Sequence, residues 1–332
     1  MNFNDLKKAL KGVVIVQTTP FKDDGSLDLD GVRTNTRRMV DKMAGKDVSL
    51  MVEGSNGEFF NQSEEEWKSV VETVVGEVNG EIPVLVHAAQ CGTLETIRRC
   101  KYAESVGADG VIVVLPYYIV PMEEGIYQHY KKICESVNIG VIMYNNPFVS
   151  GAWIRPALMA KIVKIPNFIG IKENTSSVMS FRLMQKYVEP DAVVLCGRGE
   201  EIYPFVAPYG CPGFVSFIAN IAPERSYEMY EAAMAKDFEK VDEIAESLKS
   251  FYKEDQILSN LPEGTSFTAK MTKKYGKVAS VSGGGAPMQF AIIKTAMDMI
   301  GLKGGVPRLP LIPLEEEDKA ELREVLKGIG IL

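Results

Sequence analysis

The sequence contains the stretch Asn167-Phe168-Ile169-Gly170-Ile171-Lys172-Glu173-Asn174-Thr175, from which the organisation of the chain can be worked out. Residues 168–171 of this stretch contain no polar side chain, which is typical of a short strand buried on both faces. Side chains alternate along a strand, so Phe168, Gly170 and Lys172 share one face. A lysine therefore ends a row that otherwise points into a core. Burial favours the neutral amine, which is a nucleophile toward carbonyl carbon. The alternative is a lysine whose ammonium group reaches solvent at the strand end.

Short apolar runs of this kind recur along the chain, and each is followed by a turn and a longer amphipathic segment. The runs that we expect to be strands are 13–18, 48–53, 84–89, 110–115, 140–144, 168–172, 192–196 and 213–218. Helical patterning is seen in the segments 29–43, 63–78, 93–106 and 123–137. Buried strands separated by helices predict a parallel α/β sheet, and eight of them favour a closed (β/α)8 TIM barrel. A doubly wound open sheet is the alternative, but no Gly-x-Gly-x-x-Gly motif follows an early strand.

The alternation stops after Asn220, and we expect a barrel over residues 1–224 and a C-terminal helical region over 225–332 packed on it. We expect a helix from Pro223 to Phe251, a break near 261–264, a second helix over 288–300, and a last helix that begins at the acidic run 315–318. The run 282–287, Ser-Gly-Gly-Gly-Ala-Pro, is expected to be a connector, with an anion cradle as the alternative.

Composition limits the possible functions. The 332 residues are 46% hydrophobic, carry a net charge of -7 and contain no long basic cluster, so we expect no nucleic-acid partner. Five scattered cysteines indicate reduced thiols and a cytoplasmic protein, and two distant histidines argue against a histidine-built metal centre. The N-terminal residues show no apolar run behind a basic flank, so no membrane insertion is expected.

Polar residues follow several of the predicted strands. They include 53–58 (Glu-Gly-Ser-Asn-Gly-Glu), 115–118, 143–147 and 172–174. All strands of a parallel barrel end at one mouth, so these groups should meet. Ser55 and Asn56 lie between glycines and can present backbone N–H groups to a carboxylate. Tyr144 ends the strand before that of Lys172, which brings a phenol near the amine. Imine formation needs such a proton carrier.

Four short motifs occur in order at these strand ends: Gly54-Ser55-Asn56-Gly57-Glu58, Pro116-Tyr117-Tyr118, Tyr144-Asn145-Asn146-Pro147 and Gly170-Ile171-Lys172-Glu173. Together they resemble the dihydrodipicolinate synthase and N-acetylneuraminate lyase superfamily of Schiff-base-forming, pyruvate-handling lyases. The resemblance covers roughly residues 12–223 and is weaker in the helical tail.

The resemblance implies a role for each matching residue. Lys172 would form an imine with the C2 carbonyl of a 2-oxo acid, and Tyr144 would transfer protons through Ser55 and Tyr118. Backbone N–H groups of Ser55 and Asn56 would hold the substrate carboxylate. The tyrosine matching Tyr118 reaches into a neighbouring subunit in relatives, which implies a homo-oligomer, usually a dimer of dimers. No metal or organic cofactor is expected.

The pocket residues indicate which substrate to expect. Val215 matches an apolar position that lines the pocket. Val149 stands where the synthase carries an arginine for its aldehyde partner, and this argues against lysine-biosynthetic condensation. We therefore expect cleavage or dehydration of a 4-hydroxy-2-oxo acid or a 2-keto-3-deoxy sugar acid. Arg198 and Asn174 could bind the distal end of such a substrate, although Arg198 could instead form a surface ion pair.

Three alternatives remain open at this point. Phe148, Phe214 and Phe217 could form an apolar distal pocket for an aromatic benzylidenepyruvate-type substrate, as in hydratase-aldolases of the superfamily. The chain could be a non-catalytic relative that binds a 2-oxo acid. A metal-dependent barrel aldolase would need clustered ligands that His87 alone does not supply.

Overall fold

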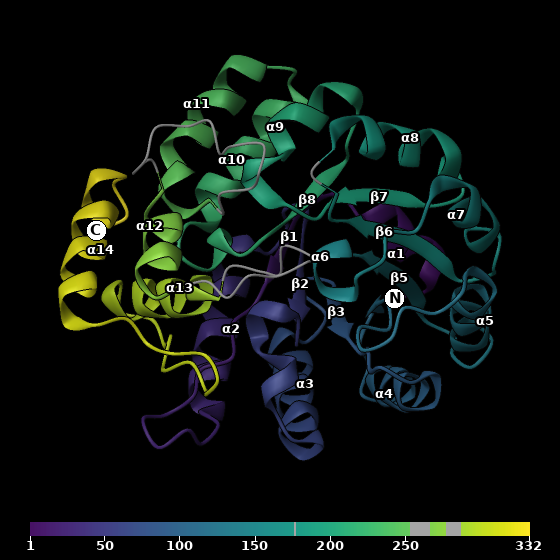
Figure 1. The fold of residues 1–332 in the computed structure, drawn as a ribbon, viewed down its shortest axis with the longest axis horizontal. Coiled ribbons are helices and arrows are strands. Elements are labelled where there is room, and N and C mark those ends of the chain that lie inside the picture. Colours follow the sequence, from purple (N-terminus) through teal and green to yellow (C-terminus); the bar gives the residue numbers. More distant parts are fainter. Residues whose placement is uncertain (176, 253–265, 277–286) are drawn as a thin grey trace.

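The chain folds into a closed barrel of eight parallel strands, in which each strand pairs with the next and β8 pairs with β1 (Figure 1). The computed structural model describes residues 1–175, 177–252, 266–276 and 287–332. The strands are β1 (Gly12–Val16), β2 (Val48–Val52), β3 (Val84–His87), β4 (Gly110–Val114), β5 (Gly140–Asn145), β6 (Phe168–Glu173), β7 (Val193–Cys196) and β8 (Gly213–Ser216). The predicted (β/α)8 TIM barrel is confirmed.

Helices connect the strands on the outside of the barrel. They are α2 (Leu29–Met43), α3 (Glu64–Val78), α4 (Thr93–Ser105), α5 (Glu123–Cys134), α6 (Pro147–Ser150), α7 (Pro156–Ile162), α8 (Val178–Val188) and α9 (Tyr203–Val206). The start of α3 follows from its sequence, because Ser63 accepts a hydrogen bond from the Glu66 backbone and the Glu66 side chain accepts one from Ser63. Helix α4 begins at Thr93, the first residue of the expected segment 93–106, and its N-cap is Gly92.

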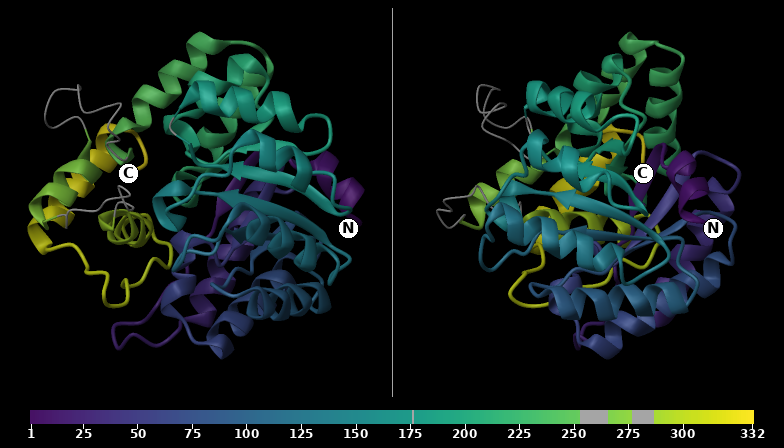
Figure 2. Two further views of the ribbon diagram at one scale, coloured as in Figure 1. Left: turned by 45° about the vertical axis from the view of Figure 1, so that its right-hand side comes forward. Right: turned by 90° about the vertical axis from the view of Figure 1, so that its right-hand side faces the viewer.

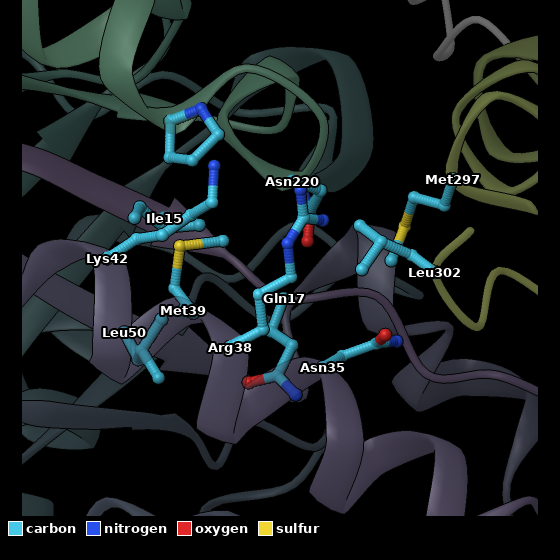
Figure 3. A pocket seen from close by; sticks show the side chains of 11 residues that line it. Ile15, Gln17, Asn35, Arg38, Met39, Lys42, Leu50, Asn220, Met297 and Leu302 are labelled. Atoms are coloured by element: carbon cyan, nitrogen blue, oxygen red, sulfur yellow. The ribbon is translucent and has the colours of Figure 1, made fainter. Parts of the chain in front are cut away.

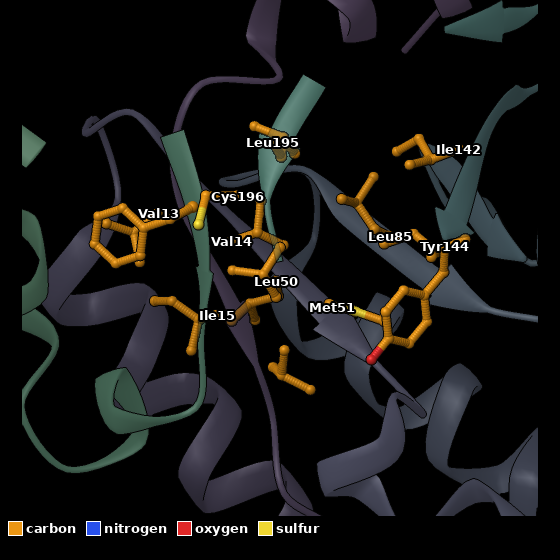
Figure 4. Packing of buried hydrophobic residues seen from close by; sticks show 14 of the residues in the cluster. Val13, Val14, Ile15, Leu50, Met51, Leu85, Ile142, Tyr144, Leu195 and Cys196 are labelled. Atoms are coloured by element: carbon orange, nitrogen blue, oxygen red, sulfur yellow. The ribbon is translucent and has the colours of Figure 1, made fainter. Parts of the chain in front are cut away.

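Figure 4 shows buried side chains from neighbouring strands, some pointing into the barrel and others to the outer face of the sheet. The inward-pointing side chains fill the barrel. Fully or nearly fully buried apolar residues of this interior layer are Val14, Met51, Leu85, Ile142 and Leu195. Burial of each such side chain contributes about 1.5–3 kcal/mol. Because the layer is packed, the barrel is a solid support for the residues at its mouth and does not form a channel.

The N-terminal helix α1 (Phe3–Ala9) closes the end of the barrel at which the strands begin. Leu6 and Leu10 are buried there. Gly110 and Gly140 start two adjacent strands, and a Cβ atom at either would lie 2.6 Å or 3.1 Å, respectively, from Leu6 Cδ2. Glycine at these positions lets the leucine enter. The opposite end, where the strands finish, is left for the functional residues.

The C-terminal region forms α10 (Pro223–Met234), α11 (Phe238–Leu248), α12 (Phe267–Lys274), α13 (Met288–Met299) and α14 (Glu316–Gly328). The last helices and α1 lie on opposite sides of the barrel in the left view of Figure 2. The expectation of one helix from Pro223 to Phe251 is wrong. Lys236 takes a left-handed conformation (φ 62°), and the Asp237 side chain accepts a hydrogen bond from the Lys240 backbone, which starts α11 as a new helix.

Of the other features expected in the C-terminal region, some are confirmed, some lie outside the described residues and one stays untested. The helix expected over 288–300 and the last helix expected to begin at the acidic run 315–318 are confirmed by α13 and α14. The expected break at 261–264 and the glycine-rich run at 282–286 lie outside the described residues. A division at residue 224 falls in the first turn of α10, which packs on β1 and α2, and it stays a prediction. None of the described helices has the length and apolar composition of a membrane span.

A small hollow lies between β1, α2, α10 and α13, outside the barrel (Figure 3). Ile15 and Leu50 line it from the outer face of the sheet, and Arg38 and Lys42 of α2 line its cationic side. Lys172 is not among its lining residues. The hollow is therefore separate from the barrel mouth.

Candidate active site

Lys172 and Tyr144 meet at the mouth of the barrel. They are paired in register on the adjacent strands β6 and β5, so both side chains point inward. Each residue is only 5% exposed. The Lys172 Nζ atom lies 3.7 Å from the centroid of the Tyr144 ring. The amine is thus held at the face of the phenol ring, in contrast to the alternative of a solvent-facing lysine.

The Tyr144 hydroxyl is buried and hydrogen-bonded. Asn146 Nδ2 donates a hydrogen bond to it at 2.7 Å. Burial raises the pKa of Tyr144 to about 12, while hydrogen bonds with Asn146 and Ser55 and the charge of Arg198 act in the opposite direction. The phenol is therefore protonated at neutral pH and can donate a proton. Sequence reasoning gave Asn146 no role, although its position two residues after Tyr144 in a strand-end motif was a usable signal.

The turn after β2 carries Ser55 and Asn56. Glycine suits position 54, because a Cβ atom there would lie 2.7 Å from Val16 Cγ1 and this buried side chain would have to shift. Ser55–Gly57 forms one 3-10 turn (η1), whose first N–H groups have no partner within the turn. The turn ends at Glu58 in a left-handed conformation (φ 56°). Ser55 and Asn56 thus stand beside Tyr144 with backbone donors available to an anion.

The turn is also held by helix α13, a contact that the sequence did not reveal. Gln289 Nε2 donates a hydrogen bond to Asn56 Oδ1, and Lys294 forms an ion pair with Glu58. No local sequence signal could have indicated these contacts, because more than two hundred residues separate Gln289 from Asn56.

The single chain does not bring Tyr118 into this cluster. Tyr118 follows β4 and is 86% exposed. The next residues include further exposed apolar side chains, namely Ile119, Val120 and Met122. Tyr118 therefore projects from the barrel on an apolar surface segment.

Arg198 and Asn174 lie beyond β7 and β6. The Arg198 side chain is 7% exposed and forms an ion pair with Glu201 at 2.8 Å, so the ion pair is buried and not at the surface. Its guanidinium lies 5.6 Å from the Phe148 ring. The Asn174 Oδ1 atom is buried and has no hydrogen-bond partner among the described residues. Both side chains offer polar groups near the mouth.

Apolar residues complete the surroundings. Val215 is buried on the inner face of β8 and pairs in register with Val14. Val149 lies in α6 and is 43% exposed. Phe214 cannot line a distal pocket, because it points to the outer face of β8 and packs on Tyr203 with 4.5 Å between ring centroids. The three-phenylalanine pocket considered for an aromatic substrate is therefore wrong in this respect.

Two buried titratable residues lie at the ends of strands: His87 ends β3 and Glu53 follows β2. Burial, followed by the positive charge of Lys172, lowers the pKa of His87 to about 3. Burial raises the pKa of Glu53 to about 8, opposed by hydrogen bonds from Gln62. Both side chains are therefore neutral at pH 7. Among the described residues, no group of three or more His, Cys, Asp or Glu side chains could hold a metal ion.

Comparisons with known proteins give consistent results. Residues 9–272 match the model of the Dihydrodipicolinate synthetase family. The chain is 32% identical over 324 residues to the 4-hydroxy-tetrahydrodipicolinate synthase of Methanothrix thermoacetophila, covering 97% of this chain and 98% of that protein. It is 31% identical to the 4-hydroxy-tetrahydrodipicolinate synthase of Methanopyrus kandleri, with 97% of each chain covered.

Solved structures show the same similarity. The dihydrodipicolinate synthase of Aquifex aeolicus superposes with a TM-score of 0.80 at 27% identity, covering 97% of this chain and 99% of that one. YagE, a prophage protein of the dihydrodipicolinic acid synthase family from E. coli K12 solved in complex with pyruvate, gives a TM-score of 0.81 at 27% identity. It also covers 97% of this chain and 99% of that one.

Proposed function

The chain belongs to the dihydrodipicolinate synthetase family, and from this premise we propose that Lys172 forms a Schiff base with the C2 carbonyl of a 2-oxo acid. It is an enzyme of the lyase class and of the class I, pyruvate-dependent aldolase type. The observation that carries the proposal is the buried Lys172 amine at 3.7 Å from the ring centroid of a protonated tyrosine. The pyruvate complex of YagE supports a 2-oxo acid as the ligand.

The geometry accounts for imine formation. The Lys172 amine, in its unprotonated form, attacks C2, and a proton moves from nitrogen to the new oxygen, which gives a carbinolamine. Tyr144 then donates its proton to the carbinolamine hydroxyl, water leaves, and a protonated imine remains with a tyrosinate beside it. Ser55, which is hydrogen-bonded to Tyr144, passes protons between this phenol and the substrate.

The imine then permits a bond at C3 to break. When the tyrosinate takes the proton of a 4-hydroxyl group, the C3–C4 bond breaks, its electrons move to C3 and the imine nitrogen, and an aldehyde departs. Tyr144 returns the proton to C3, and hydrolysis of the imine releases the 2-oxo acid. Backbone N–H groups of Ser55 and Asn56 bind the carboxylate throughout, and Val215 contacts the apolar part of the substrate.

We assign the substrate to the 4-hydroxy-2-oxo acids or 2-keto-3-deoxy sugar acids. Arg198 and Asn174 would bind the hydroxyl or carboxylate groups at the distal end, since Asn174 Oδ1 is buried without a described partner. Val149 offers no charge to a second carboxylate. A second candidate is the condensation for which the archaeal relatives are named. The buried guanidinium of Arg198 favours that candidate, because it places a cation near the mouth.

We also propose that the protein is a homo-oligomer, with Tyr118 entering the site of a partner subunit. Exposed apolar residues surround Tyr118, and a second exposed apolar stripe runs along α8 at helical spacing through Met179, Leu183 and Tyr187. A dimer of dimers needs two different interfaces on each subunit, and these two exposed apolar surfaces supply them in the proposed assembly. Analytical ultracentrifugation should show a tetramer, and Met179→Lys should reduce it to a dimer. A monomer in the unaltered protein would contradict this assembly.

Borohydride trapping tests the central proposal. Incubation with pyruvate and sodium borohydride should add the mass of the reduced pyruvyl group, and peptide mapping should place it on Lys172. Lys172→Ala should abolish the adduct and turnover, whereas Lys161→Ala, on the outer helix α7, should change neither. An adduct of normal yield in Lys172→Ala would overturn the assignment.

A substrate panel separates the two reactions. The panel contains 4-hydroxy-2-oxo acids and 2-keto-3-deoxy sugar acids, monitored for released pyruvate and for loss of water. A parallel incubation with pyruvate and a carboxylate-bearing aldehyde tests condensation. Faster consumption of that aldehyde than of any panel member would support the second candidate over the first.

A further inference from the structure

We propose that helix α13 is part of the active site, with Gln289 and Lys294 as positioning residues that hold the Ser55–Gly57 turn in the shape that receives the substrate carboxylate. This inference rests on the proposed function and extends it to a region that lies outside the barrel strands. It concerns how the anion-binding backbone is held.

The first contact is between Gln289 and Asn56. Gln289 Nε2 donates a hydrogen bond to Asn56 Oδ1 at 2.5 Å. Gln289 is 3% exposed and Asn56 is 9% exposed, so solvent does not compete for this bond. The Asn56 side chain is thereby fixed by the tail helix, and its backbone N–H is fixed with it.

The second contact is between Lys294 and Glu58, two residues further along the same turn. Their side chains form an ion pair and are 1% and 0% exposed. Lys294 also donates to the Val306 carbonyl oxygen at 3.0 Å, and Glu58 Oε2 accepts from the Arg308 backbone at 3.1 Å. Glu58 is thus anchored on both carboxylate oxygens by the tail.

Glu58 needs this anchoring because of its backbone. It takes a left-handed conformation (φ 56°), which a glutamate adopts only when its surroundings impose it. The conformation ends the 3-10 turn and so sets the direction of the N–H groups of Ser55 and Asn56. The ion pair with Lys294 therefore acts on the same backbone groups as the Gln289 contact.

Backbone donors make such support important. A backbone N–H group cannot reorient by rotating a side-chain bond. How well it donates a hydrogen bond therefore depends on how firmly the backbone is held in position. Both supports come from one helix, and Met297 of that helix also accepts a hydrogen bond from Thr18 after β1, at 3.1 Å. The tail helix therefore fixes the carboxylate cradle from outside the barrel.

The test compares two ketones in borohydride trapping at Lys172. Pyruvate uses the carboxylate cradle, whereas acetone forms an imine but has no carboxylate. In Gln289→Met the pyruvate concentration for half-maximal trapping should rise about tenfold, while the rate of acetone trapping stays unchanged. The control is Gln185→Met, which replaces an equally buried glutamine on α8 and should alter neither ketone.

A second pair of variants tests the coupling and protects against misfolding. Asn56→Ser removes the same contact from the turn, and it should weaken pyruvate trapping without reducing acetone trapping. The double variant Asn56→Ser/Gln289→Met should be no weaker than the worse single variant. Thermal unfolding of each variant, relative to Gln185→Met, checks that the fold is retained.

The possible failures are distinguishable. If the unaltered protein gives no pyruvate adduct, the proposed function is wrong and this inference fails with it. If the unaltered protein is trapped normally but Gln289→Met shows the same pyruvate dependence, or loses pyruvate and acetone trapping together, the positioning role alone is overturned.

Discussion

Tyr144→Phe is the most informative change, because it removes one oxygen and keeps the ring. The ring face at 3.7 Å from Lys172 Nζ is preserved, so the surroundings of the amine change little. The phenol, with its pKa raised to about 12, is protonated at neutral pH, so the variant loses a proton donor and no charge. Asn146 Nδ2 loses its acceptor at 2.7 Å in a buried position.

Two magnitudes follow from this geometry. A buried donor left without a partner costs about 1–3 kcal/mol, so the free energy of unfolding should fall by about that amount. General acid-base catalysis contributes about 10²- to 10⁴-fold, so imine formation and turnover should slow by that factor. Pyruvate binding before the imine should change less, because the backbone N–H groups of Ser55 and Asn56 are retained, although the Ser55 hydroxyl loses its hydrogen bond with Tyr144.

The measurements separate the two effects. Quenching with borohydride at successive times gives the rate of imine formation, and urea denaturation gives the stability. Tyr209→Phe, at an exposed position in the segment that follows α9, is the matched control and should change neither quantity. If Tyr144→Phe loses the expected stability but forms the imine within about tenfold of the normal rate, the phenol is not the proton carrier.

Three further predictions concern residues around the mouth. Val149→Arg should raise the rate of condensation of pyruvate with a carboxylate-bearing aldehyde by about tenfold or more, since arginine forms bidentate hydrogen bonds with a carboxylate. If pyruvate consumption does not rise, residue 149 does not face the carboxylate of the second substrate. Glu53 keeps its proton up to a pKa of about 8, so the free energy of unfolding should fall as pH rises from about 4.5 to 8, because only the unfolded chain releases that proton. Urea denaturation of Glu53→Gln should show a smaller fall, and equal slopes would argue against a neutral Glu53. Lys294→Met should cost about 3–5 kcal/mol in urea denaturation by leaving Glu58 unpaired, and adding Glu58→Gln should recover part of it; no recovery would count against the ion pair as the cause.

The barrel could be predicted because its strands and helices carry local signals. The apolar runs and the amphipathic helix over 29–43 correspond to observed elements, including α2. The break at Lys236 was missed, since a left-handed lysine leaves little trace in a sequence. The face of Phe214 was also misjudged, because both faces of a barrel strand are apolar and only the register with β1 shows which points inward.

Part of the candidate site could be predicted from the sequence, and part of it could not. The approach of Tyr144 to Lys172 could be predicted, because consecutive parallel strands pair and their ends meet at one mouth. The contact of Gln289 with Asn56 could not, because it depends on how a distant helix docks. Tyr118 is exposed in the single chain, and its entry into the site of a partner subunit stays a prediction.

Helix α1 and the packed barrel interior have a kinetic consequence for the proposed reaction at Lys172. Leu6 and Leu10 close the far end and the interior layer is packed, so molecules can reach the proposed site only from the side where the strands finish. In the proposed cleavage, the 2-oxo acid fragment stays covalently attached to the enzyme after the aldehyde is cut away. The aldehyde must therefore diffuse out first, and product inhibition patterns should reveal an ordered release that ends with the keto acid.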